Sequence, residues 1–163
     1  GKVMHEEAAK YGREIPEIVI EPGRSMVCAA GCTLYTVGSV RDIKDARTYV
    51  SVDGGMIDNP RFVLYGAEYD AVVANRANAP RDKVQTIAGR CCESGDLVAR
   101  DLKFQTAKAE DIICTFATGA YNFSMASNYN RVPRPSIILV KEDGTTAEVV
   151  RRQTYEDLIS CDL

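Results

Sequence analysis

The sequence has no tryptophan, a single histidine and no two cysteines separated by two residues. A zinc site needs several thiolates or imidazoles at short spacings, so this absence argues against a structural metal. Cys91 and Cys92 are adjacent and would form a disulfide only with strain. Because the chain has enough apolar residues to build a core without disulfides, we expect six reduced thiols in a cytoplasmic protein.

Long apolar runs and an excess of one charge are missing as well. No stretch approaches the roughly 20 apolar residues that a membrane helix needs. No signal-peptide pattern opens the sequence. The net charge is −3 and both signs are well mixed, so the basic cluster of a nucleic-acid surface or an anionic-membrane surface is absent. We therefore expect neither nucleic acid nor a membrane as a partner.

The sequence is rich in short β-forming runs. Its 163 residues, 45% of them hydrophobic, are enough for one domain of ordinary size. Turn signals separate the runs, which favours an antiparallel sandwich or barrel. The runs cover residues 34–40, 48–52, 69–74, 84–88, 97–102, 112–116, 137–141 and 147–151. Glu142-Asp143-Gly144 predicts a hairpin between the last two runs, and residues 155–159 predict a final helical turn.

The first 32 residues have a different pattern, in which helical segments flank a single β-forming run. Residues 5–12 look like the end of a helix that Gly12 stops. Residues 17–20 predict a short buried strand, followed by the turn at residues 21–24 and a helix capped by Ser25. Strand, turn and helix form one βα unit of an α/β fold, but a lone unit leaves an exposed sheet edge. We therefore interpret the chain as a fragment of a longer enzyme.

Cys92 and Glu93 are the sharpest candidates for chemistry. They lie in the stretch Cys91–Asp96, where Ser94-Gly95-Asp96 would make a tight turn that presents both side chains. A thiol near a positive charge has a lowered pKa and can move protons near neutral pH. Glu93 could bind a substrate ammonium group. The alternative is two buried thiols before an ordinary turn, and we expect Cys91 to follow that alternative.

Three further segments could bind anions or a flat ring. Amides after Gly23 could face a phosphate, and Arg24 could clamp a carboxylate, although a surface turn would look the same. Arg61 and Tyr65 are four residues apart and share one face if the segment is helical, although spacing alone favours an exposed arginine beside a half-buried tyrosine. Tyr121 could stack on a ring or be a core residue. Residues 122–130, read alone, form a polar loop.

In order along the chain, these motifs resemble the diaminopimelate decarboxylase family. The matching motifs are EPGRS (residues 21–25), YVSVDGGMIDNPR (49–61), CCESGD (91–96) and GAYNFSMASNYNRVPRP (119–135). The resemblance covers residues 17–155. It implies an alanine-racemase-like fold, in which a (β/α)8 barrel holds pyridoxal phosphate and a C-terminal β-sandwich or Greek-key barrel follows. Residues 1–32 would be the last βα piece of that barrel, and residues 33–163 the mostly β domain.

The resemblance also implies an activity and roles for particular residues. The family removes carbon dioxide from meso-diaminopimelate to give L-lysine, as a homodimer whose active sites lie at the interface. Cys92 matches the catalytic acid that returns a proton to the carbon. The residues that match substrate contacts are Arg24, Arg61, Tyr65, Glu93 and Tyr121. The residues that match cofactor contacts are Glu21, Gly23, Arg24 and Tyr121. In the family, Cys92 and Glu93 reach the pocket of the opposite subunit.

One part of the family pattern is missing. The lysine that holds the cofactor belongs on an early barrel strand, and no lysine of this sequence stands in a comparable context. We therefore expect the lysine to lie outside this chain and the chain alone to be inactive. Two alternatives stay open: a relative acting on ornithine or arginine, and a non-catalytic module that pairs with an active homologue. The first would not need an arginine for a distal carboxylate, and the second would not need Cys92.

Overall fold

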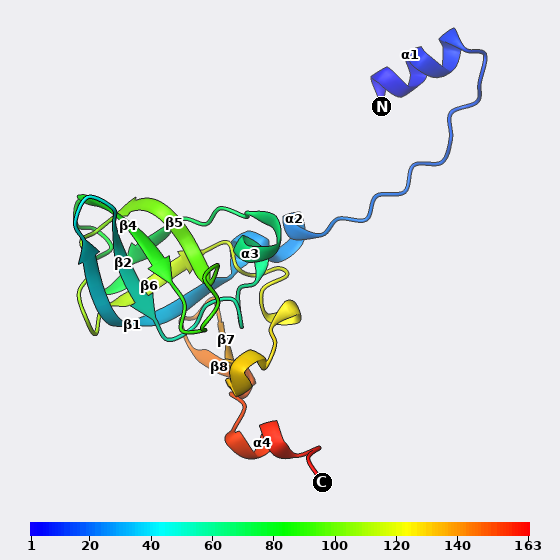
Figure 1. Ribbon diagram of the computed structural model, residues 1–163. Helices are drawn as coiled ribbons and strands as arrows, with labels where there is room; N and C mark the ends of the chain where they lie inside the picture. The colour runs from blue at the N-terminus through cyan, green and yellow to red at the C-terminus, as the bar shows by residue number, and fades with distance from the viewer.

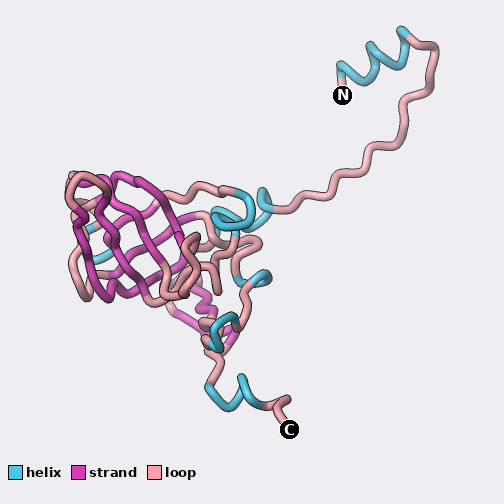
Figure 2. The backbone as a smooth tube through the Cα atoms, viewed as in Figure 1, coloured by secondary structure: helices cyan, strands magenta, loops and turns pink.

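The body of the molecule is a six-stranded sheet that curls almost into a barrel (Figures 1 and 2). The computed structural model describes all residues from 1 to 163. The strands lie in the order β3-β6-β1-β2-β4-β5. Their bounds are β1 (Cys32–Ile43), β2 (Arg47–Val52), β3 (Ala71–Val73), β4 (Lys83–Ala88), β5 (Leu97–Phe104) and β6 (Ile112–Phe116).

Strand β1 makes the sheet curl, because its two halves pair with different neighbours. Its first half, from Cys32 to Thr36, pairs with β6, and its second half, from Val37 to Ile43, pairs with β2. The register shifts between Val37 and Ser39, and a bulge of this kind bends a strand and increases its twist. β2 and β4 are parallel, whereas the other neighbours are antiparallel. The predicted mostly β fold is confirmed.

The two edge strands, β3 and β5, meet without pairing. Gln105, just beyond β5, joins them through its buried side chain. The Val73 N–H donates to Gln105 Oε1 at 3.0 Å, and Gln105 Nε2 donates to the carbonyls of Ala77 and Ala79 at 3.1 and 3.0 Å. The barrel interior is filled by twelve buried residues: Tyr35, Val37, Val50, Val52, Ala71, Val73, Ile87, Val98, Ala99, Phe104, Ala107 and Ile113.

The C-terminal segment forms a separate hairpin and a short helix. Strands β7 (Ile137–Val140) and β8 (Thr146–Val150) pair antiparallel, and Gly144 takes a positive φ of 80° in their turn, so the predicted hairpin is confirmed. Helix α4 (Tyr155–Ile159) confirms the predicted final helical turn. Thr154 and Asp157 form a capping box at its start.

The N-terminal segment differs from the prediction. Helix α1 (Lys2–Lys10) ends just before Gly12, as expected, but residues 17–20 form no strand and Ile18, Val19 and Ile20 are exposed. A barrel strand needs hydrogen-bonded neighbours on its edges, and this segment runs as an extended linker away from the sheet (Figure 1). Helix α2 (Arg24–Val27) has Gly23 as its N-cap and Ser25 inside it, so the prediction that Ser25 caps the helix is wrong. The assignment of residues 1–32 to a barrel stays a prediction.

The remaining elements are short. Helix α3 (Arg61–Tyr65) confirms that Arg61 and Tyr65 lie on one helical turn. Single 3-10 turns are η1 (Cys28–Ala30), η2 (Ala74–Arg76), η3 (Phe123–Met125) and η4 (Tyr129–Arg131). None of the helices combines the length and the hydropathy that crossing a membrane would require.

Candidate functional site

The loop between β4 and β5 carries Cys92 and Glu93 and is held from inside by Asp96. The Asp96 carboxylate is 3% exposed and accepts the N–H of Met56 at 2.6 Å and that of Cys91 at 2.7 Å. Gly55 and Gly89 border it so closely that a Cβ atom on either would overlap its oxygens. The loop is therefore anchored at its base, and the exposed Cys92 and Glu93 lie at its outer turn.

Cys92 and Glu93 meet at the hydroxyl group of Tyr129. This hydroxyl donates to Glu93 Oε1 at 2.5 Å and lies 4.0 Å from the Cys92 sulfur. The amide nitrogen of Asn130 donates to the same sulfur at 3.6 Å. The hydrogen bond to Glu93 is the main cause that raises the pKa of Tyr129 above its ordinary value. Thiol, carboxylate and phenol thus form one exposed polar group, which we call the thiol cluster (Cys92, Glu93, Tyr129 and Asn130).

The two adjacent cysteines have different environments, as the sequence predicts. Cys91 is partly buried and Cys92 is exposed. Burial, with the Asp96 carboxylate as the next cause, raises the pKa of the Cys91 thiol to about 11. A thiol with so high a pKa is almost fully protonated at neutral pH and is a poor nucleophile. Only Cys92 is therefore placed for chemistry.

Arg61, Tyr65 and Tyr121 form a second group, which we call the arginine cluster. The guanidinium carbon of Arg61 lies 5.2 Å from the centre of the Tyr65 ring and 5.4 Å from that of Tyr121. The Arg61 Nε atom is buried without a hydrogen-bond partner. Because an unpaired buried donor is costly, it marks a place for an anionic acceptor.

Tyr121 also touches the segment before α2. Its backbone has a φ of 64°, an uncommon value for a residue that is not glycine, and such strain is typical of functional sites. A Cβ atom on Gly23 would overlap the Tyr121 hydroxyl, so the two residues are in close contact and a larger residue at position 23 would displace this ring. Gly23, Tyr121 and Arg61 are thus brought together, as expected for parts of one pocket.

Arg24 and Glu21 are placed less tightly. Arg24 donates to the sulfur of Cys28 at 3.5 Å, and the Cys28 thiol donates to the carbonyl of Ala117 at 3.0 Å. Glu21 is exposed on the linker and makes no side-chain hydrogen bond. The roles of both residues stay predictions.

The residues present fit part of a pyridoxal-phosphate site. The close approach of Gly23 to Tyr121 and the unpaired Arg61 Nε suit the contacts to an anionic cofactor and an anionic substrate. No hydrogen bond or ion pair joins a lysine to either cluster; Lys10 pairs with Glu7, and Lys83 with Asp42. The chain therefore has residues suited to binding the anionic groups of cofactor and substrate, but no candidate for the lysine that binds the cofactor.

The two clusters lie on neighbouring elements, since the side chain of Val63 in α3 faces Gly95 in the loop that carries Cys92. No hydrogen bond or ion pair joins Cys92 or Glu93 to Arg61, Tyr65 or Tyr121. The sequence reading missed Tyr129 and Asn130, because residues 122–130 read alone as a polar loop. The signal that could have found them is that both lie in the family motif at residues 119–135, in which only Tyr121 was given a role.

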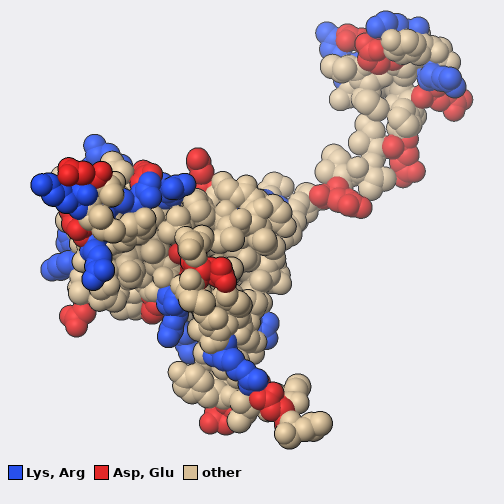
Figure 3. Space-filling view, in the orientation of Figure 1, with Lys and Arg blue, Asp and Glu red and all other residues tan.

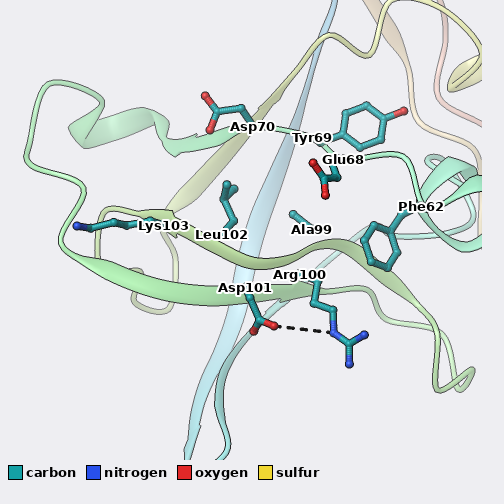
Figure 4. Close-up of a pocket in the computed structure, with 10 residues that line it drawn as sticks. Phe62, Glu68, Tyr69, Asp70, Ala99, Arg100, Asp101, Leu102 and Lys103 are labelled. Carbon is teal, nitrogen blue, oxygen red and sulfur yellow. Dashed lines mark ion pairs between the residues drawn. The ribbon is translucent and has the colours of Figure 1, made fainter.

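A cavity in the sheet lies elsewhere. It has a volume of about 650 Å³ and lies along the seam between β3 and β5, where Figure 4 shows Asp70, Leu102 and Lys103 around it. None of the predicted site residues lines it. Charged side chains gather at the barrel end far from α2, whereas the surface around α2 and α3 carries few charges in the same view (Figure 3). We therefore place the candidate site at the two clusters.

Comparison with known proteins gives a consistent result. A family model described as the pyridoxal-dependent decarboxylase, C-terminal sheet domain, matches residues 25–119. The diaminopimelate decarboxylase of Bacillus subtilis is 52% identical over 162 residues, which cover 99% of this chain and 37% of that protein. That of Staphylococcus aureus is 48% identical over 149 residues, covering 91% of this chain and 35% of that protein. The chain thus spans little more than a third of these curated relatives.

Solved structures agree in fold. The crystal structure of diaminopimelate decarboxylase from M. jannaschii matches with a TM-score of 0.83 at 34% identity, covering 99% of this chain and 37% of that chain. The same enzyme in co-complex with L-lysine matches with a TM-score of 0.84 at 33% identity, covering 99% and 36%. Because the family model covers more than half of the sequence, the chain belongs to the pyridoxal-dependent decarboxylase family, as its C-terminal sheet domain.

Proposed function

We propose that this chain forms the C-terminal part of a pyridoxal-phosphate-dependent decarboxylase that converts meso-diaminopimelate to L-lysine and carbon dioxide. The observation that carries the proposal is the thiol cluster, in which exposed Cys92 and Glu93 share the hydroxyl of Tyr129. Curated relatives that are 52% and 49% identical to this chain are diaminopimelate decarboxylases. The activity belongs to the whole enzyme, of which this chain supplies one part.

Cys92 is the acid in this proposal. Loss of carbon dioxide leaves an electron pair on the substrate carbon, and pyridoxal phosphate, when bound, supplies the electron sink. The carbon must then gain a proton from one face. A thiol suits this step, because its ordinary pKa lies within two units of neutral pH and it can be recharged from solvent. Cys92 is exposed and can reach a substrate outside its own sheet.

The substrate-binding residues can be assigned from the charges of the substrate. Its distal end carries an ammonium group and a carboxylate, which call for a carboxylate and an arginine. Glu93 is the group for the ammonium. Arg61, held between Tyr65 and Tyr121, is the group for the carboxylate, and Arg24 is a further substrate contact.

The cofactor would be held at the arginine cluster by Glu21, Gly23, Arg24 and Tyr121, with the binding lysine supplied from outside this chain. The whole enzyme would act as a cytoplasmic homodimer, as the family resemblance implies, with Cys92 and Glu93 of one subunit completing the pocket of the other. In this arrangement each pocket would have the acid, Cys92, on one face and the substrate-binding residues of the arginine cluster on another.

The test replaces Cys92 with alanine in the whole decarboxylase. Turnover of meso-diaminopimelate should fall by at least about a hundredfold, the scale of general-acid catalysis, while the absorbance of the bound cofactor persists. Cys91→Ala is the matched control, because this neighbour is partly buried and should leave most turnover intact. Equal turnover by the enzyme and the Cys92→Ala variant would refute the role.

Two further assays separate the alternatives. The 163-residue chain alone, with added cofactor, should release no carbon dioxide from diaminopimelate, since no lysine lies in either cluster. The whole enzyme should prefer diaminopimelate over ornithine and arginine, which have no distal carboxylate for Arg61. The reverse preference would favour the ornithine or arginine type. No turnover of any of the three would favour a non-catalytic module.

A further inference from the structure

Tyr129 stands between the two functional groups of the thiol cluster and has one proton for two possible acceptors. Its hydroxyl lies 2.5 Å from Glu93 Oε1 and 4.0 Å from the Cys92 sulfur. Tyr129 lies in the single turn η4, and the next residue, Asn130, has a φ of 55°. This turn brings both side chains to the sulfur, since Asn130 Nδ2 donates to it at 3.6 Å.

The protons of this group can be assigned from their chemistry. A carboxylate only accepts hydrogen bonds, so the short contact to Glu93 uses the Tyr129 proton. The side of Tyr129 that faces Cys92 then offers only oxygen lone pairs, which can receive the thiol proton but cannot stabilise a thiolate. While Glu93 is free, Tyr129 therefore has no proton to donate to the Cys92 sulfur.

We propose that Tyr129 is a positioning residue that couples the occupation of Glu93 to proton delivery by Cys92. When a cationic group pairs with Glu93, the carboxylate no longer needs the Tyr129 hydroxyl, which is free to turn to the sulfur. Cys92 then gives its proton to the substrate carbon, and the electron pair of the broken S–H bond stays on the sulfur. Tyr129 and Asn130 both donate to this thiolate, which takes a new proton from solvent.

The inference rests on the proposed function for its meaning in catalysis, but its physical content does not need the cofactor. In this chain, neutralising Glu93 should make the Cys92 thiolate easier to form, and this effect should require the Tyr129 hydroxyl. A hydrogen bond to a charged acceptor changes an equilibrium by about tenfold or more. The more acidic thiol is a weaker nucleophile, so a net gain of about threefold in alkylation rate is expected near neutral pH.

The experiment is a double-mutant cycle on the 163-residue chain. The rate of alkylation of Cys92 by iodoacetamide is measured in the wild type, Glu93→Gln, Tyr129→Phe and the double variant, from pH 6 to pH 10. Trypsin cleaves after Arg90 and Arg100, and fragment ions of the released peptide distinguish Cys92 from Cys91. Measurements in 1 M salt suppress the direct effect of the Glu93 charge, because the screening length falls to about 3 Å.

Glu93→Gln should speed alkylation of Cys92 about threefold when Tyr129 is present and by much less in the Tyr129→Phe background. Equal effects of Glu93→Gln in both backgrounds would overturn the coupling. Tyr155→Phe is the matched control, because this exposed tyrosine makes no hydrogen bond through its hydroxyl. Slow alkylation of the buried Cys114 in every variant verifies that the sheet stays folded.

A second readout uses the whole decarboxylase. Tyr129→Phe should lower kcat for diaminopimelate by about tenfold with a smaller change in KM, since the lost contact acts after binding. If kcat is unchanged, the coupling has no part in turnover and the inference is overturned at that level. If the thiol cycle shows the coupling but no variant or wild type decarboxylates diaminopimelate, the proposed function fails and the coupling stands.

Discussion

Asp58 is a buried carboxyl group whose charge the fold opposes. Its side chain accepts the N–H of Gly55 at 2.9 Å and the hydroxyl proton of Tyr35. Burial is the largest cause that raises its pKa to about 6, and the nearby charges of Asp96 and Asp53 act in the same direction, against the two hydrogen bonds. The folded state therefore holds a proton on Asp58 more tightly than the unfolded state, in which the ordinary value of 3.8 applies.

This shift predicts how stability depends on pH. The stabilisation that protonated Asp58 gives the folded state is fully present below pH 4 and is lost as the pH rises through about 6. The reason is that the ionised carboxylate is destabilised by burial only in the folded state. The free energy of unfolding of the wild type should fall by about 2.4 kcal/mol relative to Asp58→Asn between pH 4 and pH 7. Urea denaturation of the wild type and of Asp58→Asn at each pH measures this change in the free energy of unfolding. A difference that stays constant over this range would contradict the shift.

At the scale of an element, the loop at residues 89–96 depends on the carboxylate of Asp96. Its two oxygens accept one amide each, from Met56 and from Cys91, and so join this loop to the one after β2. An asparagine has one oxygen, so its amide group would face one of the two N–H donors. The loop that carries Cys92 and Glu93 is thus fixed by a carboxylate that forms no hydrogen bond with the side chain of either residue.

Asp96→Asn should therefore loosen this loop and lower the free energy of unfolding by about 1–3 kcal/mol, the cost of a buried donor without a partner. Hydrogen exchange should quicken at the amides of Met56 and Cys91, and less elsewhere. Asp45→Asn is the matched control, because Asp45 is exposed and its side chain makes no hydrogen bond. Unchanged exchange at both amides in Asp96→Asn would contradict the anchoring role.

At the scale of the whole molecule, the curl of the sheet depends on the seam between β3 and β5. These strands do not pair, and Gln105 supplies three hydrogen bonds across the gap. Gln85 supports it from β4, donating to the Gln105 carbonyl at 3.0 Å. At the seam, hydrogen bonds from the buried side chains of Gln85 and Gln105 thus take the place of the backbone hydrogen bonds that join paired strands elsewhere.

Gln105→Ala should lower the free energy of unfolding by about 3 kcal/mol, because the N–H of Val73 and two carbonyls lose their partner in a buried place. Lys103→Ala, at an exposed position of β5, should change the free energy of unfolding by less than about 0.5 kcal/mol. Both values come from denaturant titrations. A loss below about 1 kcal/mol for Gln105→Ala would mean that water replaces the three bonds.

The strands of the barrel were predictable because alternation and turn residues are local signals. All eight runs named from the sequence are strands, although β3 covers only Ala71–Val73. The strand predicted at residues 17–20 failed for a non-local reason: its β-branched residues find no neighbouring strand in this structure. Cys92, Glu93, Arg61 and Tyr121 were found through motifs, whereas Tyr129 was not, because nothing in its local sequence points to a thiol.

The sequence by itself determined the mostly β class, the exposed thiol and carboxylate of the loop, and the family to which the motifs belong. These properties depend on residues that are close together along the chain. Only the tertiary structure decided that Tyr129 lies at Glu93 and Cys92, which are 36 and 37 positions away, and that Gln105 closes the barrel from 32 positions beyond Val73. Such contacts are set by how the sheet curls, because packing brings together side chains whose separation no local pattern records.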